Sequence, residues 1–495
     1  MCSKTAPILN FDLPYPRGLP IGDDWVSVDT FDDLEFPYDG SFITSAPRGG
    51  AQLAAQALDH ALAVRETVGT LPAHVRRNVL LKAHEAVAAS RAQFEQILVL
   101  ESGKPLVDCR VEVNRTLVTL AAAAEEVAHI HGETVPMDSL PSGEGLFGFW
   151  IRKPIGVVVA IAGFNYLLML AVHKIAPAIA AGCPVIVKPA PHTPLATLWL
   201  VDILRNALVE AGAPASAVQL VTGGIEVGKT LTQDRRIGLV SFTGSAAVGH
   251  QIAKTAAPTK VLLELGSNAA LVVDEDANLD AAADAVIRGG YYASGQACIS
   301  VQRVIAVESI CEQLLDRIEA RVPHIVVGDP RDEATTLYAL IDTRSTERVR
   351  SWIAAAESAG ARVVIGEKTE GRLLSPTVLT DVPLDHQVWR EEIFGPVVAV
   401  RSVADINEAF ATVNDSRYGL HVSVFTRSLA TSFSAINQIE AGDVVINEVP
   451  GFRSDIQPYG GVKDSGPGRE GPRFAIEDMT VTRMAIIRPD SRKTT

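Results

Sequence analysis

The chain has 495 residues, of which 47% are hydrophobic and 21% charged, so it holds enough apolar sequence for about three folded domains and is not a disordered chain. Its formal net charge of −14 disfavours nucleic acids and anionic membrane surfaces as partners, because both attract basic proteins. The sequence opens without a basic, then apolar leader and lacks any uncharged apolar run of about 18 residues, so we expect a cytoplasmic protein with no membrane partner.

The first part of the chain predicts irregular or short-strand structure followed by helices. Prolines interrupt any helix over residues 1–50. The apolar spacing is then helical in four ranges: 51–68, 76–89, 91–102 and 105–129. Residues 131–153 are polar and contain glycine before they become strand-like over 146–152, which predicts a projecting hairpin.

From Gly156 onward the sequence alternates between strand and helix patterns. The candidate strands are 157–161, 184–188, 218–221, 238–242 and 260–264. The candidate helices between them are 168–181, 193–211, 226–232 and 246–254. This alternation predicts a doubly wound α/β fold, a parallel sheet covered on both faces, with ligands beyond the carboxyl ends of the strands.

A second alternating stretch runs from Ala269 to about Asn447, and we interpret it as the catalytic domain. Its helices are expected at 279–291, 310–322 and 344–358. It contains Cys298 in a segment of small residues, 293–300, where a thiol could be reached by a substrate. Residues 481–488 are rich in β-branched side chains and predict a C-terminal strand.

Three polar side chains indicate acyl-thioester chemistry. Cys298 is a candidate nucleophile, and Glu264 lies in an otherwise apolar strand, where burying a carboxylate is costly. Asn165 places an amide just after the strand 157–161. Thiol, carboxylate and amide are the groups that such chemistry needs. Taken singly, Cys298 is also compatible with a small buried residue and Glu264 with the cap of a strand edge. The five cysteines are scattered and odd in number, so neither a disulfide framework nor a metal site is expected.

Seven short motifs occur in this order: Phe164-Asn165, Lys188-Pro189, Phe242 to Ser245, Glu264 to Gly266, Gly295 to Cys298, Glu392 to Pro396, and Tyr459 to Gly466. With this order and spacing, from about residue 45 onward, the chain resembles the aldehyde dehydrogenase superfamily. Within it, the chain is similar to the branch of non-phosphorylating glyceraldehyde-3-phosphate, lactaldehyde and phosphonoacetaldehyde dehydrogenases.

The resemblance implies a Rossmann-like cofactor domain, an α/β catalytic domain and a small β oligomerisation arm. The expected ranges are 1–130 and 150–265 for the cofactor domain, 266–460 for the catalytic domain, and 131–149 and 478–495 for the arm. In the family such an arm pairs with the C-terminal strand of another subunit, so a homo-oligomer, either a dimer or a tetramer, is expected.

The cofactor implied by the resemblance is NAD or NADP, although no Gly-x-Gly-x-x-Gly fingerprint is present. Lys188 would contact the adenosine ribose, and Gly244 and Ser245 the pyrophosphate at a helix start, where free N–H groups favour phosphate. Ser245 is equally compatible with a plain helix cap. Glu392 and Phe394 would contact the nicotinamide ribose and ring, or form an exposed acidic turn. The remaining cofactor residues would be Gly224, Gly228, Phe242 and Leu265.

One departure from the family pattern concerns the choice of cofactor. Members strict for NAD usually carry a glutamate three residues after the lysine, where this chain has Pro191. Because no carboxylate stands there to repel a 2′-phosphate, we expect NADP to be accepted, alongside NAD.

In the mechanism that the resemblance implies, Cys298 attacks an aldehyde. The Asn165 amide and the Cys298 N–H stabilise the oxyanion, hydride leaves for the nicotinamide, and water deprotonated by Glu264 hydrolyses the thioester. The further departures, none of which removes a reacting group, are Gly163, Leu167, Ser267 and Ala270.

The substrate site implied by the resemblance contains Arg115, Tyr166 and Arg453, which hold an anion in phosphate- or phosphonate-using members. Those members often have a third arginine where this chain has Ala297, which favours a smaller anion or a hydroxyaldehyde. Arg115 is also compatible with an ion pair to Glu112 on the same helix, and Arg453 with a surface loop charge.

Two other functions stay open on the residues alone. One is a cysteine-dependent hydrolase or acyltransferase that uses no dinucleotide, and the other is a non-catalytic structural descendant of the fold. The hydrolase would need a histidine base, and none of the eleven histidines lies in a motif that indicates one. The structural descendant predicts loss of a reacting residue, yet Cys298, Glu264, Asn165 and Lys188 are all present.

Overall fold

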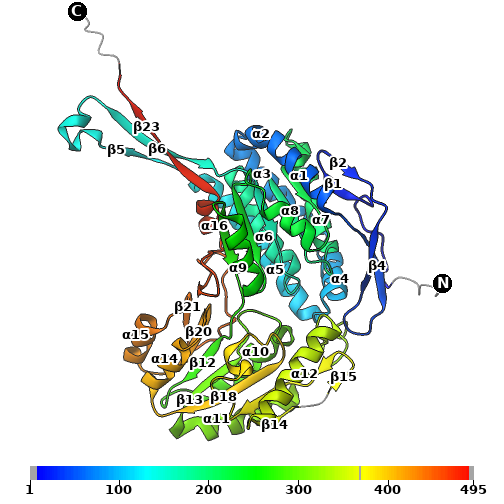
Figure 1. The fold of residues 1–495 in the computed structure, drawn as a ribbon, viewed down its shortest axis with the longest axis vertical. Helices are drawn as coiled ribbons and strands as arrows, with labels where there is room; N and C mark the ends of the chain where they lie inside the picture. The colour runs from blue at the N-terminus through cyan, green and yellow to red at the C-terminus, as the bar shows by residue number, and fades with distance from the viewer. Residues whose placement is uncertain (1–7, 367–368, 490–495) are drawn as a thin grey trace, which may run out of the picture.

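The protein consists of two sheets flanked by helices, with a narrow three-stranded ribbon projecting from one of them (Figure 1). The structure is a computed structural model that describes residues 8–366 and 369–489. The remaining parts of the predicted cofactor domain (1–7), catalytic domain (367–368) and arm (490–495) lie outside the described residues.

The N-terminal part contains short strands and then helices, as predicted. The strands form two small antiparallel pairs: β1 (Leu19–Ile21) with β2 (Asp24–Val26), and β3 (Phe31–Glu35) with β4 (Phe42–Pro47). The helices are α1 (Ala51–Ala63), α2 (Arg65–Gly69), α3 (Ala73–Ala89), α4 (Arg91–Ser102) and α5 (Leu106–Glu126). Pro105 was predicted in the first turn of the helix 105–129, but it is the N-cap of α5, which begins one residue later.

The first large sheet has five parallel strands in the order β11-β10-β7-β8-β9. They are β7 (Val158–Ile161), β8 (Val185–Lys188), β9 (Val218–Leu220), β10 (Leu239–Thr243) and β11 (Lys260–Glu264). The connecting helices are α6 (Leu167–Ala181), α7 (Leu195–Glu210), α8 (Ile225–Thr232) and α9 (Ala246–Ala256). The predicted doubly wound α/β class is confirmed, and β7, β8 and β9 are fully buried, as expected for strands covered on both faces.

The second sheet has seven strands in the order β14-β17-β18-β13-β12-β20-β21, all parallel except β14. They are β12 (Ala270–Val273), β13 (Arg303–Val307), β14 (Arg362–Ile365), β17 (Thr377–Thr380), β18 (Val397–Val403), β20 (His421–Phe425) and β21 (Asp443–Ile446). Its helices include α10 (Leu279–Tyr291), α11 (Glu308–Arg321), α12 (Thr343–Ser358), α14 (Ile406–Asn414) and α15 (Leu429–Gln438).

The projecting ribbon joins β5 (Glu133–Val135), β6 (Phe147–Pro154) and β23 (Thr480–Ile487) (Figure 1). β23 pairs with β6 of the same chain, so the expectation that the arm takes its C-terminal strand from another subunit is wrong. The reason is that α16 (Pro472–Asp478) packs against α6 and delivers β23 directly beside β6. Apolar side chains stay exposed on the ribbon: Phe147, Ile151, Val481, Met484, Ile486 and Ile487.

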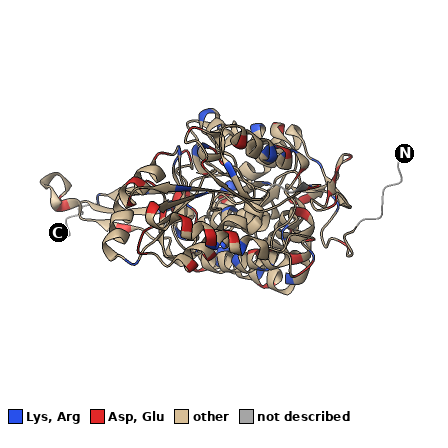
Figure 2. Ribbon diagram, turned by 90° about the horizontal axis from the view of Figure 1, so that it is seen from below, with Lys and Arg blue, Asp and Glu red and all other residues tan. Residues whose placement is uncertain are grey.

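Figure 2 shows acidic and basic residues interspersed over the whole molecule in this view. Within residues 8–366 and 369–489, no helix has the length and apolar character needed to cross a bilayer.

Candidate active site

The two sheets face one another across a cavity of about 630 Å³. The strands β7, β10 and β11 point their carboxyl ends at it, and loops that precede β13 and β18 close it from the other side. The predicted site residues that line it are Arg115, Asn165, Tyr166, Gly244, Ser245, Glu264, Leu265, Cys298, Glu392, Phe394 and Arg453. Four predicted cofactor residues do not line it: Lys188, Gly224, Gly228 and Phe242.

The loop before Cys298 is held tightly, which accounts for its small residues. Ala293 and Ser294 have positive φ angles of 48° and 53°, and Ser294 Oγ donates a 2.8 Å hydrogen bond to the Tyr338 carbonyl. A Cβ on Gly295 would lie 2.0 Å from the Gly395 carbonyl oxygen, so only glycine fits there. This close contact fixes the cysteine loop against the segment that carries Glu392 and Phe394.

Cys298 is a protonated thiol at neutral pH in this structure. Burial, together with the nearby Glu392 and Glu264, raises the pKa of Cys298 to about 12. Tyr459 opposes this shift, because its hydroxyl lies 3.2 Å from Sγ and stabilises the thiolate. The nucleophile therefore needs additional positive charge or a proton acceptor to ionise.

Asn165 brings its amide to the same loop. It lies in the turn between β7 and α6, and its Nδ2 donates a 2.8 Å hydrogen bond to the Gln296 carbonyl, two residues before Cys298. An amide nitrogen has two hydrogens, so one N–H stays free for an oxyanion formed at Cys298.

Glu264 ends β11 as a buried acid with 6% of its surface exposed. Within the described part of the chain, neither carboxyl oxygen has a hydrogen-bond partner, which argues against the alternative of a strand-edge cap. Burial, and secondly the charge of Glu470, raise the pKa of Glu264 well above its usual value. Such a group is a strong proton acceptor once it is ionised.

The start of α9 fits a phosphate. A Cβ on Gly244 would lie 2.6 Å from the Phe242 ring, which explains the glycine and gives Phe242 a packing role behind the turn. Ser245 is the N-cap residue, yet its side chain makes no cap hydrogen bond within the described helix, so the plain-cap alternative is not supported. The first residues of α9 line the cavity, where helix N–H groups favour an anion.

Lys188 and Gly228 form a second group near the end of β8. A Cβ on Gly228 would lie 3.8 Å from Lys188 Cε, and the lysine Nζ contacts the Pro189 carbonyl at 3.5 Å. Among the described ion pairs, none involves Lys188, and burial lowers its pKa. A mostly buried ammonium group without an acid partner fits a ligand rich in hydroxyl or phosphate oxygens.

Glu392 is held by backbone rather than by a side chain. The Ser267 N–H donates a 3.0 Å hydrogen bond to its Oε1, and burial raises the pKa of Glu392 to about 7. A Cβ on Gly266 would lie 2.4 Å from Glu392 Oε2, so a larger residue there would displace the Glu392 carboxylate. Because the Ser267 backbone makes the contact, a serine at this position leaves the Glu392 site intact. Phe394 meets Phe164 edge-to-face at 5.8 Å.

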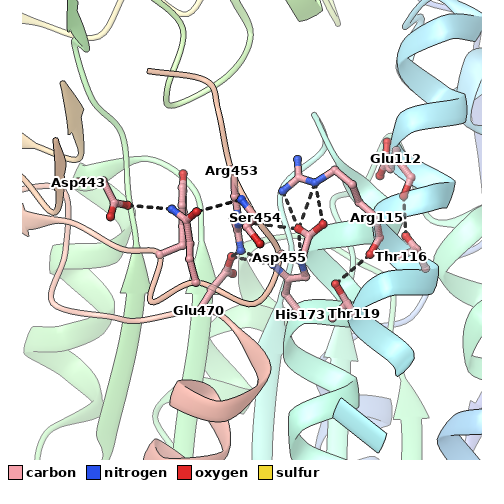
Figure 3. A network of polar contacts seen from close by, with 12 residues as sticks. Glu112, Arg115, Thr116, Thr119, His173, Asp443, Arg453, Ser454, Asp455 and Glu470 are labelled. Atoms are coloured by element: carbon pink, nitrogen blue, oxygen red, sulfur yellow. Dashed lines mark hydrogen bonds and ion pairs between the residues drawn. The ribbon is translucent and has the colours of Figure 1, made fainter. Parts of the chain in front are cut away.

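The two predicted substrate arginines line the cavity, but each is bound to an acid (Figure 3). Arg115 donates from Nε at 3.1 Å to both Asp455 oxygens and from Nη2 at 2.7 Å to Oδ1. Arg453 Nη2 donates at 2.9 Å to Glu470, and its guanidinium lies 3.7 Å from the centre of the Tyr459 ring.

Both alternatives for these arginines are wrong. Glu112 forms a buried ion pair with Lys104 instead of with Arg115. The Arg453 side chain is only 4% exposed and is not a surface loop charge.

Sequence reasoning did not identify the acids and bases around these arginines. Lys174 donates from Nζ to Thr243 Oγ1 at 2.6 Å and to Glu470 Oε1 at 3.0 Å. His173 contacts Glu470 at 2.9 Å and Asp455 at 3.4 Å. One sequence signal was available, because His173 and Lys174 are the basic residues in the otherwise apolar helix α6. The cavity wall also includes Tyr292, Arg348, Trp352 and Tyr459.

Comparisons with known proteins agree on one family. The sequence profile of the Aldehyde dehydrogenase family matches residues 25–485. The chain is 40% identical to a 3-sulfolactaldehyde dehydrogenase from Priestia aryabhattai, over 84% of this chain and 87% of that one.

Solved structures give the same result. The chain is similar to aldehyde dehydrogenase 21 from Physcomitrella patens in complex with the reaction product succinate, with a TM-score of 0.92, 35% identity, and 96% and 98% of the two chains covered. It is also similar to a glyceraldehyde-3-phosphate dehydrogenase from Methanocaldococcus jannaschii complexed with NADP, with a TM-score of 0.89, 34% identity, and 93% and 100% covered.

Proposed function

Because the chain belongs to the aldehyde dehydrogenase family and is an NAD(P)-dependent enzyme that oxidises aldehydes, we propose that its substrate is a small anionic or hydroxylated aldehyde. The observation that carries the proposal is one cavity that holds the thiol of Cys298, the acid of Glu264 and two arginines, Arg115 and Arg453. The names of the relatives support it, since they include a sulfonated aldehyde and a succinate product.

In the proposed mechanism the chain supplies the nucleophile, the oxyanion donor and the base. Cys298 loses its proton to solvent water and its sulfur bonds to the aldehyde carbon, while the free N–H of Asn165 stabilises the oxyanion. When bound, the dinucleotide supplies a nicotinamide ring that accepts hydride from that carbon. Glu264 then takes a proton from water, the hydroxide attacks the thioester carbon, and the carboxylic acid leaves as the Cys298 thiolate is released.

The residues proposed to hold the cofactor fall into three groups. Gly224 and Lys188, which has Gly228 beside it, would contact the adenosine ribose. Gly244 and Ser245 would contact the pyrophosphate, and Leu265, Glu392 and Phe394 would line the nicotinamide end. In this proposal residues 1–130 and 150–265 form the cofactor domain, and 266–460 form the catalytic domain.

We also propose that the protein works as a homo-oligomer through the arm at 131–149 and 478–495. The supporting observation is the apolar surface that the arm exposes away from the body, including Phe147 and Ile486, which are 50% and 57% exposed. Exposed apolar surface of this kind is typical of an interface.

The direct test is a panel of semialdehydes, hydroxyaldehydes, phosphonoaldehydes and neutral aldehydes with NADP or NAD, measured by the absorbance of the reduced cofactor. We expect turnover of an anionic or hydroxylated aldehyde by the wild type and none by Cys298→Ala, which should still bind the dinucleotide. Equal or better turnover of neutral alkyl aldehydes would contradict the substrate class, and substantial activity in Cys298→Ala would contradict the nucleophile.

A further inference from the structure

One carboxylate, that of Asp455, lies between the two cavity arginines (Figure 3). Its Oδ1 accepts from Arg115 Nη2 at 2.7 Å, and the same atom is 3.9 Å from Arg453 Nε. Asp455 is 6% exposed and does not line the cavity, so it acts on a bound substrate only through the arginines.

His173 is the third residue beside the Asp455 carboxylate, after Arg115 and Arg453. Arg453 Nη2 lies 2.7 Å from His173 Nδ1, and Glu470 Oε2 lies 2.9 Å from the same nitrogen. The other ring nitrogen, Nε2, faces Asp455 Oδ1 at 3.4 Å. Burial alone would raise the pKa of Asp455, but the hydrogen bonds from His173 and Arg115 lower it below its usual value, so the carboxyl is ionised.

The direct contacts leave one positive charge uncompensated. Three cations, Arg115, Arg453 and Lys174, face two carboxylates, Asp455 and Glu470. Asp455 occupies Nε and Nη2 of Arg115, which leaves the Nη1 edge of that guanidinium free of the pair (Figure 3). Arg115 also lines a second cavity of about 360 Å³, which shares Tyr166 and Arg453 with the first.

We propose that Asp455 is a specificity-determining positioning residue, which holds Arg115 and cancels one charge so that the site selects an aldehyde with a single negative charge. A carboxylate or sulfonate matches one uncompensated cation, whereas a phosphate dianion adds a second charge that faces Asp455 without a partner. The inference deepens the proposed function, because it assumes that this cavity receives the aldehyde.

The test compares three substrates in the wild type and in Asp455→Asn. The substrates are a carboxylate semialdehyde (succinic semialdehyde), glyceraldehyde 3-phosphate, and propanal, whose turnover serves as the reference for general damage. Asparagine keeps an oxygen for Arg115 but removes the charge. The kcat/KM ratio of phosphate over carboxylate substrate should rise about tenfold or more, mainly through KM.

Two control variants separate charge from folding. Asp455→Glu keeps the charge and should stay near the wild-type ratio. Asp443→Asn makes the same chemical change at a nearby acid that contacts Gln457 and His421 instead of the arginines, and it should not move the ratio. An unchanged ratio in Asp455→Asn, or an equal loss on all three substrates, would overturn the inference.

A measurement on the wild type keeps the inference testable if Asp455→Asn does not fold. Propionate should inhibit propanal oxidation more tightly than the ethyl phosphate dianion, and tighter inhibition by ethyl phosphate would overturn the inference. The two proposals fail separately. Absence of turnover with every anionic and every hydroxylated aldehyde would sink the proposed function, whereas good turnover with the phosphorylated substrate preferred would sink only the charge selection.

Discussion

At the scale of single residues, Cys298 shows how a side chain takes its reactivity from its surroundings. Its thiol lines the cavity but is largely shielded from solvent and lies near Glu392 and Glu264. Burial and these two acids raise its pKa, so the thiol keeps its proton at neutral pH. A thiol with so high a pKa reacts slowly with alkylating agents at neutral pH, since only the thiolate is strongly nucleophilic.

The raised pKa of Cys298, about 12, predicts a steep pH dependence of alkylation in the cofactor-free protein. Below its pKa the thiolate fraction grows about tenfold per pH unit, so labelling by iodoacetamide should rise continuously across the neutral and alkaline range. Mass spectrometry of the labelled peptide measures the rate. Tyr459→Phe removes the hydroxyl that lowers the pKa and should slow labelling, and a plateau of the wild-type rate near neutral pH would contradict the assignment.

For the two arginines, the sequence allowed their position in the cavity to be predicted but not the residues they pair with. Arg115 and Arg453 could be predicted as cavity residues from the resemblance, and both line the cavity. Their partners could not, because Asp455 and Glu470 come from segments whose approach to α5 and α6 depends on the complete fold. The sequence shows which charged residues are present, but not which of them form ion pairs with each other.

At the scale of elements, a buried ion pair couples α5 to the start of α6. Lys104 and Glu112 pair with side chains only 1% and 0% exposed, and Glu112 Oε1 also accepts from the Leu168 and Met169 N–H groups at 2.9 and 3.2 Å. These two N–H groups begin the helix that follows Asn165. The pair therefore helps to position the turn that carries the oxyanion donor.

Lys104→Met should lower the free energy of unfolding by about 3–5 kcal/mol, because it leaves the Glu112 carboxylate buried without its cation. Chemical denaturation measures the change. The matched control is Lys82→Met, which breaks the exposed 2.5 Å pair with Glu210 and should cost about 0–1 kcal/mol. Equal effects of the two variants would contradict the structural role given to the Lys104–Glu112 pair.

The loop between β8 and α7 carries the prediction on cofactor choice. Pro191→Glu should weaken NADP binding much more than NAD binding, because the new carboxylate would face a doubly charged 2′-phosphate near Lys188. Fluorescence titration with each dinucleotide gives the two dissociation constants. Pro191→Gln, which adds a similar volume without charge, is the control, and an unchanged NADP/NAD ratio in Pro191→Glu would show that residue 191 does not face the 2′ position.

Hydrophobic periodicity located most elements to within a few residues. The predicted strand 260–264 and helix 91–102 coincide with β11 and α4, since both have strong and uninterrupted patterns. The partner of the C-terminal strand was predicted wrongly. A strand pattern gives the faces of a strand but contains no information on whether the neighbouring strand belongs to the same chain.

At the scale of the whole molecule, the projecting arm predicts self-association. Ile486 is 57% exposed and lies near the end of β23, a strand of the arm that projects from the body (Figure 1). Ile486→Glu should reduce the mass measured by sedimentation velocity toward that of one chain. Val209→Glu, at a 60% exposed position near the end of α7, is the matched control and should leave the mass unchanged. A wild type that sediments as a monomer would contradict the proposed homo-oligomer.

The fold class and the approach of Glu264 and Asn165 to one cavity could be anticipated because parallel strands place their carboxyl ends at one edge. Cys298 precedes β13, and its place in the cavity could be anticipated only from the family resemblance. The closing of that cavity by the second sheet could not, since it depends on how loops before β13 and β18 pack against the first. The domain ranges and the roles of the site residues remain predictions, and one experiment addresses the most important of these roles.

That experiment is rapid mixing of Glu264→Gln with NADP and succinic semialdehyde, followed by quenching and mass spectrometry. Without its base the enzyme should release about one equivalent of reduced cofactor per site and then slow by about 10²–10⁴-fold, with an acyl group retained on Cys298. Steady turnover at the wild-type rate, or a burst with no acyl group on Cys298, would contradict thioester hydrolysis by Glu264-activated water.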